Sequence, residues 1–277
     1  MKNLLFIFFL QFSVVSFANI VSTGERHVCT LISDEVKCVG DNKFGQTTVP
    51  VLNKPTQVSA GGKHTCALDA DGVHCWGNNE SSQITVPVLN KPTQVSAGGN
   101  HTCALDADGV KCWGLNRSGQ TNVPELSNPT QVSAGEWRTC AMDKGIVKCW
   151  GSGIIKIELP ELNKPQVISA GGYYSCAIED LGNVKCWGFL IADPSEMPAF
   201  KNPQQVTAGG DHACALDDEG VKCWGNNNFG QLNLPVLNHP TQVSAGKYQV
   251  CALDDDGVKC WGQAPNPASE TSVDLQE

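Results

Sequence analysis

Fourteen cysteines recur along this chain in pairs, and their regular spacing limits the possible folds more than any other feature. Eight residues separate the two cysteines of a pair, or nine in one case, and successive pairs follow at intervals of 36 to 38 residues. The pairs are Cys29/Cys38, Cys66/Cys75, Cys103/Cys112, Cys140/Cys149, Cys176/Cys186, Cys214/Cys223 and Cys251/Cys260. A fixed period of this length is typical of solenoids and propellers. Seven units fill residues 19–277 and leave no room for a second domain.

The first 18 residues differ from the repeats. Lys2 precedes an apolar run, and the segment ends in Ser16-Phe17-Ala18, with small residues where signal peptidases need them. We therefore predict a signal peptide over residues 1–18, with a retained membrane anchor as the alternative. In the oxidising compartment that export implies, an even number of cysteines indicates disulfides. The expected location is secreted or periplasmic, without membrane insertion after cleavage.

One complete repeat, residues 57–92, contains short apolar runs separated by Gly, Asp-Gly and Pro turn signals, and it has no helical periodicity. We expect strands at 57–60, 65–68 and 73–76. A short outer strand or extended segment should follow at 85–89. The repeats begin near residues 20, 57, 94, 131, 167, 205 and 242. The sequence thus predicts an all-β, seven-bladed β-propeller, because the rungs of a β-helix, the competing fold, are shorter than this period.

The two cysteines of each pair should lie on neighbouring strands of one hairpin, with Asp69-Ala70-Asp71-Gly72 as a typical turn. If the turn has two residues, Cys66 lies opposite Cys75 and can form a disulfide. If Gly72 forms a bulge after a three-residue turn, the two side chains fall on opposite faces. We predict one hairpin disulfide per blade. Zinc binding is the weaker alternative, because the spacing lacks a Cys-x2-Cys element, and we predict no metal or other cofactor.

A longer motif accompanies each cysteine pair: Ala-Gly-Gly-x-His-Thr-Cys-Ala-Leu, then Asp-Gly-Val, Cys-Trp-Gly-x-Asn and Gly-Gln. It resembles the regulator of chromosome condensation repeat family, in the cysteine-bearing form common in secreted bacterial proteins, over essentially all of residues 19–277. Val39 replaces the tryptophan in repeat one, and repeats four, five and seven lack the later Gly-Gln. The resemblance implies a propeller, but this fold serves unrelated functions.

Three recurring positions have structural interpretations. One of them, called the column position below, holds His27, His64, His101, Arg138, Tyr174, His212 and Gln249. A catalytic or ligating histidine would be unique, so we expect hydrogen-bonding roles. The Asp-x-Asp-Gly turns resemble the start of a calcium loop but lack its later ligands, which favours solvated turns with Asp capping its own backbone. The repeated tryptophans should pack between blades.

Positions that vary among the repeats are where a function can lie. The residue before the column position reads Arg26, Lys63, Asn100, Trp137, Tyr173, Asp211 and Tyr248. Its loop and the loop after Trp-Gly should share one face of the propeller. Repeats four and five depart most, and the candidate partner-binding residues are Trp137, Arg138, Ile154, Ile155, Tyr173, Tyr174, Phe189, Leu190 and Tyr248. Their composition is typical of a protein-binding hot spot, the alternative being that degenerate repeats merely repacked.

The sequence therefore predicts a non-enzymatic, monomeric scaffold for an unknown protein partner. It resembles in architecture the secreted β-lactamase inhibitory proteins of this family, although no residue match indicates that target. A lectin or an enzyme would need a distinctive polar group at the channel mouth, and no Gly-x-Ser-x-Gly or metal motif is present. The predicted export and the net charge of −9 disfavour nucleic-acid binding and the nucleotide-exchange role of the family's namesake. Ser272–Leu275 could add an outer strand to the last blade.

Overall fold

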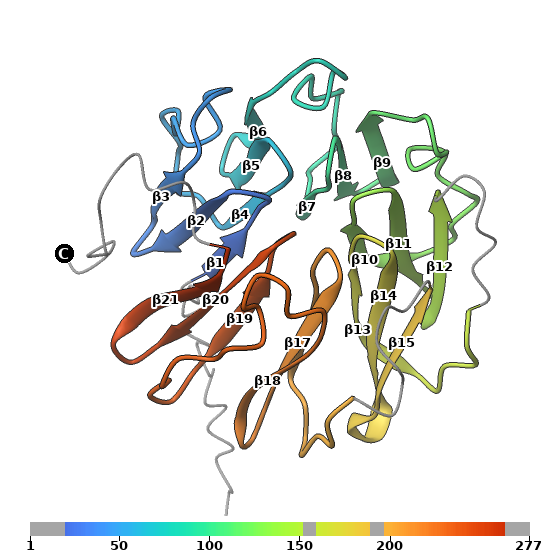
Figure 1. Ribbon diagram of the computed structural model, residues 1–277. Coiled ribbons are helices and arrows are strands. Elements are labelled where there is room, and N and C mark those ends of the chain that lie inside the picture. Colours follow the sequence, from blue (N-terminus) through green and yellow to red (C-terminus); the bar gives the residue numbers. More distant parts are fainter. Residues whose placement is uncertain (1–19, 152–158, 189–196, 264–277) are drawn as a thin grey trace, which may run out of the picture.

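A ring of seven β-sheets surrounds a central channel in the computed structural model (Figure 1). The structure describes residues 20–151, 159–188 and 197–263. Within these ranges, 21 strands form seven three-stranded antiparallel sheets, each made from one continuous stretch of chain. The predicted all-β, seven-bladed propeller is confirmed. The predicted leader and the C-terminal strand candidate at 272–275 lie outside the described residues.

The three strands of each blade occupy equivalent places from the channel outward. The inner strands are β1 (Ile20–Thr23), β4 (Gln57–Ala60), β7 (Gln94–Ala97), β10 (Pro129–Ala134), β13 (Pro165–Ala170), β16 (Gln205–Ala208) and β19 (Gln242–Ala245). The middle strands are β2 (His27–Ile32), β5 (His64–Asp69), β8 (His101–Asp106), β11 (Arg138–Asp143), β14 (Tyr174–Glu179), β17 (His212–Asp217) and β20 (Gln249–Asp254). The outer strands are β3 (Glu35–Gly40), β6 (Gly72–Gly77), β9 (Gly109–Gly114), β12 (Ile146–Gly151), β15 (Val184–Gly188), β18 (Gly220–Gly225) and β21 (Gly257–Gly262).

The hairpin between the middle and outer strands carries the disulfide. In the second blade a two-residue turn pairs Asp69 with Gly72, which places Cys66 directly opposite Cys75. The two Cα atoms are 4.1 Å apart and the sulfurs are bonded. The other six predicted pairs are also joined: Cys29–Cys38, Cys103–Cys112, Cys140–Cys149, Cys176–Cys186, Cys214–Cys223 and Cys251–Cys260. The alternative bulged register, with the sulfurs on opposite faces, is therefore excluded.

The two cysteines of each disulfide differ in burial, a difference that the repeated sequence pattern does not reveal. The first cysteine, on the middle strand, is fully buried in all seven blades. The second cysteine, on the outer strand, is not: it is half-buried at Cys38, Cys75, Cys112, Cys149, Cys186 and Cys223, and exposed at Cys260. The outer strand forms the edge of its sheet, so it has a neighbouring strand on one side only. Each disulfide therefore joins a core residue to a more accessible residue at the rim of the ring.

In the second blade, whose connection is fully described, the segment after the outer strand is extended but adds no fourth strand. Residues 85–89, where the sequence predicts an outer strand or extended segment, form no ladder. Pro87 stands in the middle of this segment and has no N–H to donate to a sheet. The connection is held instead at its end, where the Asn90 N–H donates to Asp106 Oδ2 at 2.8 Å and the Thr93 N–H donates to the Leu105 carbonyl at 2.8 Å.

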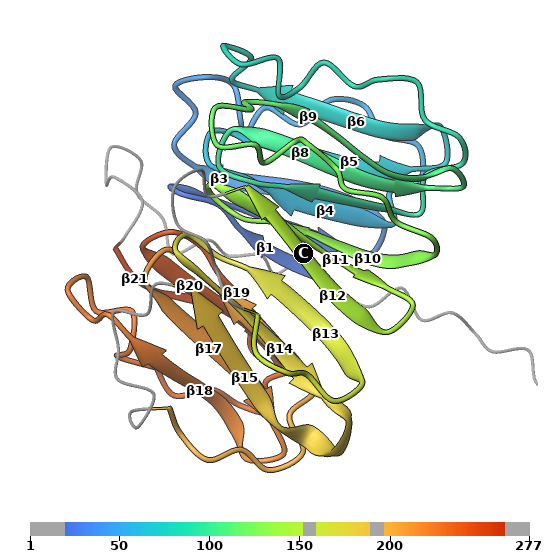
Figure 2. The same cartoon turned by 90° about the vertical axis from the view of Figure 1, so that its right-hand side faces the viewer.

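The hydrophobic core consists of separate clusters between adjacent blades, which stack face to face (Figure 2). In one of them Cys66 and Leu68 of β5 pack against Val95 and Ala97 of β7. In another, Trp76 packs against residues of the first blade, as the sequence predicts for the repeated tryptophans. Stability therefore depends on each blade having a neighbour, as in other repeat architectures.

Side chains of one inner strand satisfy the free edge of the next. The Ser59 hydroxyl accepts the Ala97 N–H at 2.9 Å, and Gln57 Oε1 accepts the Val95 N–H at 2.9 Å. The hydroxyl contact occurs at all seven blade interfaces. One of them joins Ser244 of β19 to Thr23 of β1 and closes the ring. These bonds satisfy backbone N–H groups at the inner edge of each sheet that would otherwise have no partner.

Glycine is required where the inner strands end. A Cβ atom on Gly61 would lie 2.4 Å from the Gly98 carbonyl oxygen of the next blade and 2.6 Å from the ring of His64. Equivalent glycines show the same approach around the ring, at 2.1 to 2.5 Å from the next carbonyl. Only glycine fits at this position, because the ends of the inner strands converge on the channel.

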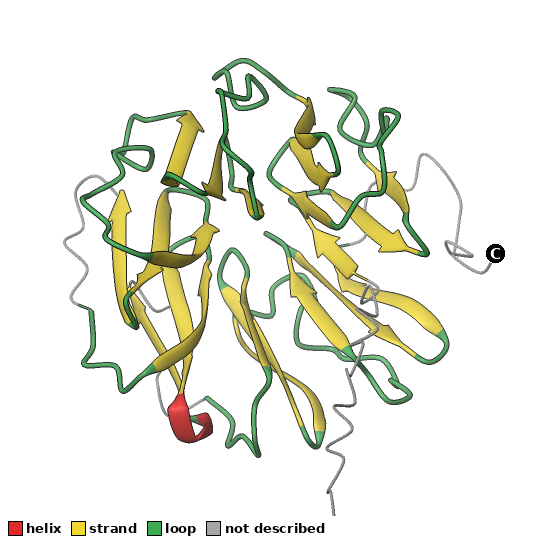
Figure 3. Cartoon of the chain, turned by 180° about the vertical axis from the view of Figure 1, so that it is seen from behind, coloured by secondary structure: helices red, strands yellow, loops and turns green. Residues whose placement is uncertain are grey.

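Helical structure is nearly absent from the described part of the chain (Figure 3). The exception there is η1 (Asp180–Gly182), a single 3-10 turn that replaces the two-residue hairpin turn in the fifth blade. No helix within the described ranges has the length and apolar character needed to cross a membrane.

Candidate functional site

Residues that recur in several of the repeats form a buried connection between blades, called the latch below. His27 Nε2 lies 2.9 Å from the hydroxyl of Thr65 in the next blade. That hydroxyl donates to the carbonyl of Gln46 at 2.8 Å, and the Trp76 indole N–H donates to the same carbonyl at 3.0 Å. A hydroxyl has one proton to donate. The histidine must therefore donate from Nε2, which leaves its Nδ1 unprotonated.

The latch recurs through the first four blades and is incomplete later. Its second and third copies are His64, Thr102, Gln83 and Trp113, and His101, Thr139, Gln120 and Trp150. Between blades six and seven the Trp261 indole still donates to the Gln231 carbonyl, at 2.8 Å, but Val250 replaces the threonine. His212 consequently has no partner for either ring nitrogen within the described residues.

Burial keeps these histidines uncharged. It lowers the pKa of His27, His101 and His212 to about 4 and that of His64 to about 3. Imidazoles with such values do not exchange protons near neutral pH, which argues against acid–base catalysis by the column. The expected hydrogen-bonding role is confirmed for His27, His64 and His101, although the bond joins two blades.

Two residues of the candidate surface prove to be buried, and this corrects the prediction for them. Arg138 is 2% exposed and Tyr174 is 5% exposed, because the column position starts the middle strand and its side chain points between blades. Arg138 Nη2 donates to the carbonyl of Tyr173 at 2.6 Å, and burial lowers its pKa to about 10. Both residues pack blades together and are not available to a partner in this arrangement.

Three other candidates do reach the loop face, the face that carries the loops before the middle strand and after the outer strand. Tyr173 is 43% exposed, whereas Trp137 and Tyr248 are half-buried. The ring of Tyr248 lies 5.0 Å from that of Phe229, which is itself 45% exposed. Ile154, Ile155, Phe189 and Leu190 lie outside the described residues.

Phe229 and Phe44 are loop-face residues that the sequence interpretation missed. Each follows the glycine that ends its outer strand by four positions and directly precedes the Gly of the Gly-Gln pair. The equivalent residues of the second and third repeats are Ser81 and Ser118. An aromatic side chain where other repeats have serine was therefore the available signal.

The channel mouth holds a group of charged residues that the sequence interpretation also missed. Glu25, Glu136 and Lys247 occupy the repeat position that is glycine in the other four blades. Lys247 Nζ lies 2.7 Å from Glu136 Oε1 and 3.7 Å from Glu25 Oε1, which links the seventh blade to the fourth and the first. Burial alone would lower the pKa of Lys247, but its bond to Glu136 and the two carboxylates raise it well above the usual value.

These charged residues line a small cavity at the mouth of the channel. The cavity there measures about 130 Å³ and is lined mainly by Ala and Gly backbone, together with this ion-paired group. Ligand sites usually measure several hundred Å³. Among the described residues, no group of three His, Cys, Asp or Glu side chains could hold a metal ion. A second cavity of about 400 Å³ lies further along the channel and is lined by the inner strands of all seven blades, largely by Gln, Val and Ser residues.

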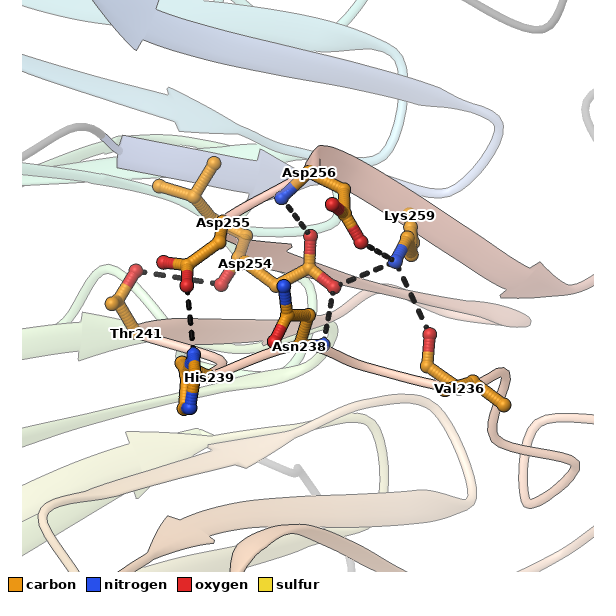
Figure 4. Close-up of polar contacts among 9 residues, drawn as sticks. Val236, Asn238, His239, Thr241, Asp254, Asp255, Asp256 and Lys259 are labelled. Atoms are coloured by element: carbon orange, nitrogen blue, oxygen red, sulfur yellow. Dashed lines mark hydrogen bonds and ion pairs between the residues drawn. The ribbon is translucent and has the colours of Figure 1, made fainter.

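The opposite face carries the Asp-Gly turns, whose carboxylates serve the turns themselves. Figure 4 shows Asp254 accepting the N–H groups of Asn238 and Asp256, each at 2.9 Å, and the ammonium group of Lys259 at 2.8 Å. Burial would raise the pKa of Asp254, but these bonds lower it overall. Lys259 is also bonded to Asp256 at 2.8 Å. The expected capping role of the aspartate is confirmed.

Comparison with known families identifies the repeat. Residues 56–83, 93–120 and 204–231 match the family described as the regulator of chromosome condensation (RCC1) repeat. Each match runs from just before an inner strand to the glutamine of the loop after the outer strand. It therefore spans the residues that build the latch. Comparison with curated protein sequences gives no significant match.

Several solved structures share the architecture. The ectodomain of the receptor kinase ACR4 from Arabidopsis thaliana is 29% identical, with 90% of this chain and 96% of that one covered and a TM-score of 0.72. The ectodomain of the receptor kinase CR4 from Physcomitrella patens is 26% identical, with 88% and 72% covered and a TM-score of 0.74. Yeast RCC1 (Prp20), solved with Kap60, is 17% identical, with 90% and 81% covered and a TM-score of 0.68.

Proposed function

Because the chain belongs to the RCC1 repeat family, we propose that it is an exported, non-enzymatic scaffold that binds another protein through its loop face. One observation carries this proposal. The residues that recur among the repeats are buried in latches and strand contacts, whereas the residues that vary include the exposed or half-buried aromatics of the loop face. Large aromatic side chains on such a surface are typical of protein-binding hot spots.

The compartment and the relatives support the same proposal. Seven disulfides and no free cysteine within the described residues are typical of an oxidising environment. The two plant structures that share more than a quarter of their residues with this chain are receptor ectodomains. Yeast RCC1 (Prp20) was solved bound to Kap60, and Prp20p from Saccharomyces cerevisiae was studied for its binding to Gsp1p and histones. Proteins that contain a propeller of this fold therefore include protein-binding proteins.

The test is capture of binding partners by the purified protein and two double variants. Trp137→Ala/Tyr173→Ala removes two aromatic side chains from the loop face. Val88→Ala/Val236→Ala is the matched control, because these valines are 92% and 90% exposed on the connections between blades, outside that face. We expect the first variant to lose the captured proteins and the second to retain them, as quantified by mass spectrometry.

Two outcomes would contradict the proposal. If the wild type and the Trp137→Ala/Tyr173→Ala variant capture the same proteins equally well, these aromatics do not form the binding surface. If the protein instead binds a defined glycan on a sugar array, and that glycan competes with the captured proteins, the lectin function is favoured. Equal melting temperatures for all three proteins would show that any loss of capture does not come from unfolding.

A further inference from the structure

We propose that the loop face over blades one and two is a docking surface for an acidic segment of the partner protein. The surface, called the basic patch below, consists of Arg26, Lys43, Phe44 and Lys63. This inference rests on the proposed function and adds the chemistry of the partner to it. It places a contact on the side of the ring where the latches are complete and the loops are therefore firmly held.

Two lysines from different blades converge on one aromatic ring. Lys63 Nζ, from the second blade, lies 5.2 Å from the centre of the Phe44 ring, and Lys43 Nζ lies 5.8 Å from it. These distances are within the range of cation–π contacts. Both lysines are exposed and Phe44 is half-buried. The arrangement concentrates two positive charges on a small apolar centre.

The backbone that carries the patch is held by buried groups. The Phe44 N–H donates to Gln46 Oε1 at 2.9 Å, and Gln46 is only 1% exposed. The carbonyl of Arg26 accepts the Asp41 N–H at 2.9 Å, which ties this exposed arginine to the base of the same loop. The surface is therefore largely pre-formed, so binding of a partner would lose little conformational entropy in this loop.

The charges of the patch are not neutralised by the protein itself. Within the described residues, Arg26, Lys43 and Lys63 have no carboxylate within 4.0 Å. The neighbouring carboxylate, Asp41, accepts the Gln46 side-chain amide at 3.1 Å and the Lys43 N–H at 3.2 Å. Figure 4 shows the contrast on the opposite face, where Lys259 is held by two aspartates.

An acidic protein segment fits this surface better than a uniform polyanion. The chain has a net charge of −9, so a polymer of high negative charge density would be repelled by the rest of the molecule. A peptide that places carboxylates on either side of one apolar side chain would pair with the lysines and contact Phe44. Such local complementarity raises the association rate and selects the partner.

The experiment compares three fluorescein-labelled peptides of 12 residues with the same apolar residues, whose charged positions are all Glu, all Gln or all Lys. Binding is measured by fluorescence polarisation at low and physiological salt. We expect the Glu peptide alone to bind, more weakly as salt increases. Lys43→Gln/Lys63→Gln should weaken it about tenfold, the order expected for the loss of two exposed ion pairs.

The matched control is Lys54→Gln/Lys91→Gln, which removes the same charge from two exposed lysines on the opposite face. It should change the affinity less than twofold. An equal loss with both variants would mean a general charge effect and would overturn the proposal, as would no loss with either. Heparin and phosphatidylserine vesicles are tested in parallel, and binding of either one without the Glu peptide would also overturn it.

The same variants separate this inference from the proposed function. If Lys43→Gln/Lys63→Gln still captures the proteins that wild type captures, while Trp137→Ala/Tyr173→Ala does not, the scaffold function stands and the basic patch fails. If no protein is captured by any form and the Glu peptide does not bind, both fail. If the Glu peptide binds as expected but no protein is captured, the basic patch stands as a peptide site and the scaffold function fails.

Discussion

At the scale of single residues, the latch explains why a histidine in one repeat is followed by a threonine at the next position of the following repeat in the first four blades. Three histidines face a threonine of the next blade, whereas His212 faces Val250 and neither of its ring nitrogens has a partner among the described residues. A buried donor without an acceptor is costly. We therefore predict that Val250→Thr, which keeps the side-chain shape, raises the free energy of unfolding by about 1 kcal/mol, measured by urea denaturation.

The control for this prediction is Val95→Thr in the third blade. Val95 is 1% exposed and packs against Cys66 and Leu68, so a new hydroxyl there finds no histidine. This variant should be destabilised. Equal effects of the two substitutions would show that the threonine contributes through its own propensity and that the latch bond is not its main role.

At the scale of elements, each hairpin disulfide stabilises its own blade, because both of its cysteines belong to that blade. Closing a loop of about ten residues is worth about 2.5 kcal/mol in the chain-entropy model. We predict that Cys103→Ala/Cys112→Ala lowers the free energy of unfolding by about this amount, measured by chemical denaturation without reductant. In the presence of reductant the variant and the wild type should differ by much less, since neither then holds this bond. A loss that persists unchanged in reductant would assign the effect to packing.

The strands and their pairing could be predicted because the same turn and cysteine signals recur in all seven repeats. Asp-Gly turns, small inner residues and cysteines at fixed spacing all agree on one hairpin geometry, and the structure has it. The candidate surface is harder to predict, because variation alone does not say whether a side chain points outward. Arg138 and Tyr174 vary and yet are buried, since their position starts the middle strand. The sequence interpretation missed Glu136 because its repeat position is glycine in most blades, which indicates a structural role.

At the scale of the whole molecule, contacts between adjacent blades form a closed ring, and these contacts differ from one interface to the next. Inner-strand hydroxyl bonds pass through every interface, including the closing one between Ser244 and Thr23. The latches strengthen the first three interfaces, whereas blades four to seven depend on other contacts, among them the bridge from Lys247 to Glu136 across the channel. We expect such a ring to unfold when any one interface between blades opens. Buried groups at different interfaces should therefore contribute to the same free energy of unfolding.

The four buried histidines should make this stability depend on pH. Their pKa values in the fold are about 3 to 4, below the ordinary value of 6.5. Between these values the unfolded chain binds protons at the histidines and the folded chain does not. The stability that they contribute is complete above pH 6.5 and is lost as pH falls towards 4. Burial raises the pKa of Asp211, which opposes this with a single proton. The hydrogen-bonded turn aspartates, whose pKa values are lowered from 3.8, add to the loss of stability below about pH 5, where the unfolded chain begins to protonate its carboxylates.

We therefore predict that the free energy of unfolding decreases steadily between pH 6.5 and 4, with a slope that approaches the uptake of three to four protons. Denaturant titrations at half-unit pH steps measure it. His64→Asn should reduce the slope by about one proton, because it removes one of the buried imidazoles. Val88→Ala should leave the slope unchanged, since Val88 is 92% exposed and carries no titratable group. Stability that is flat across this range would mean that the buried imidazoles gain protons as readily in the folded ring as in the unfolded chain.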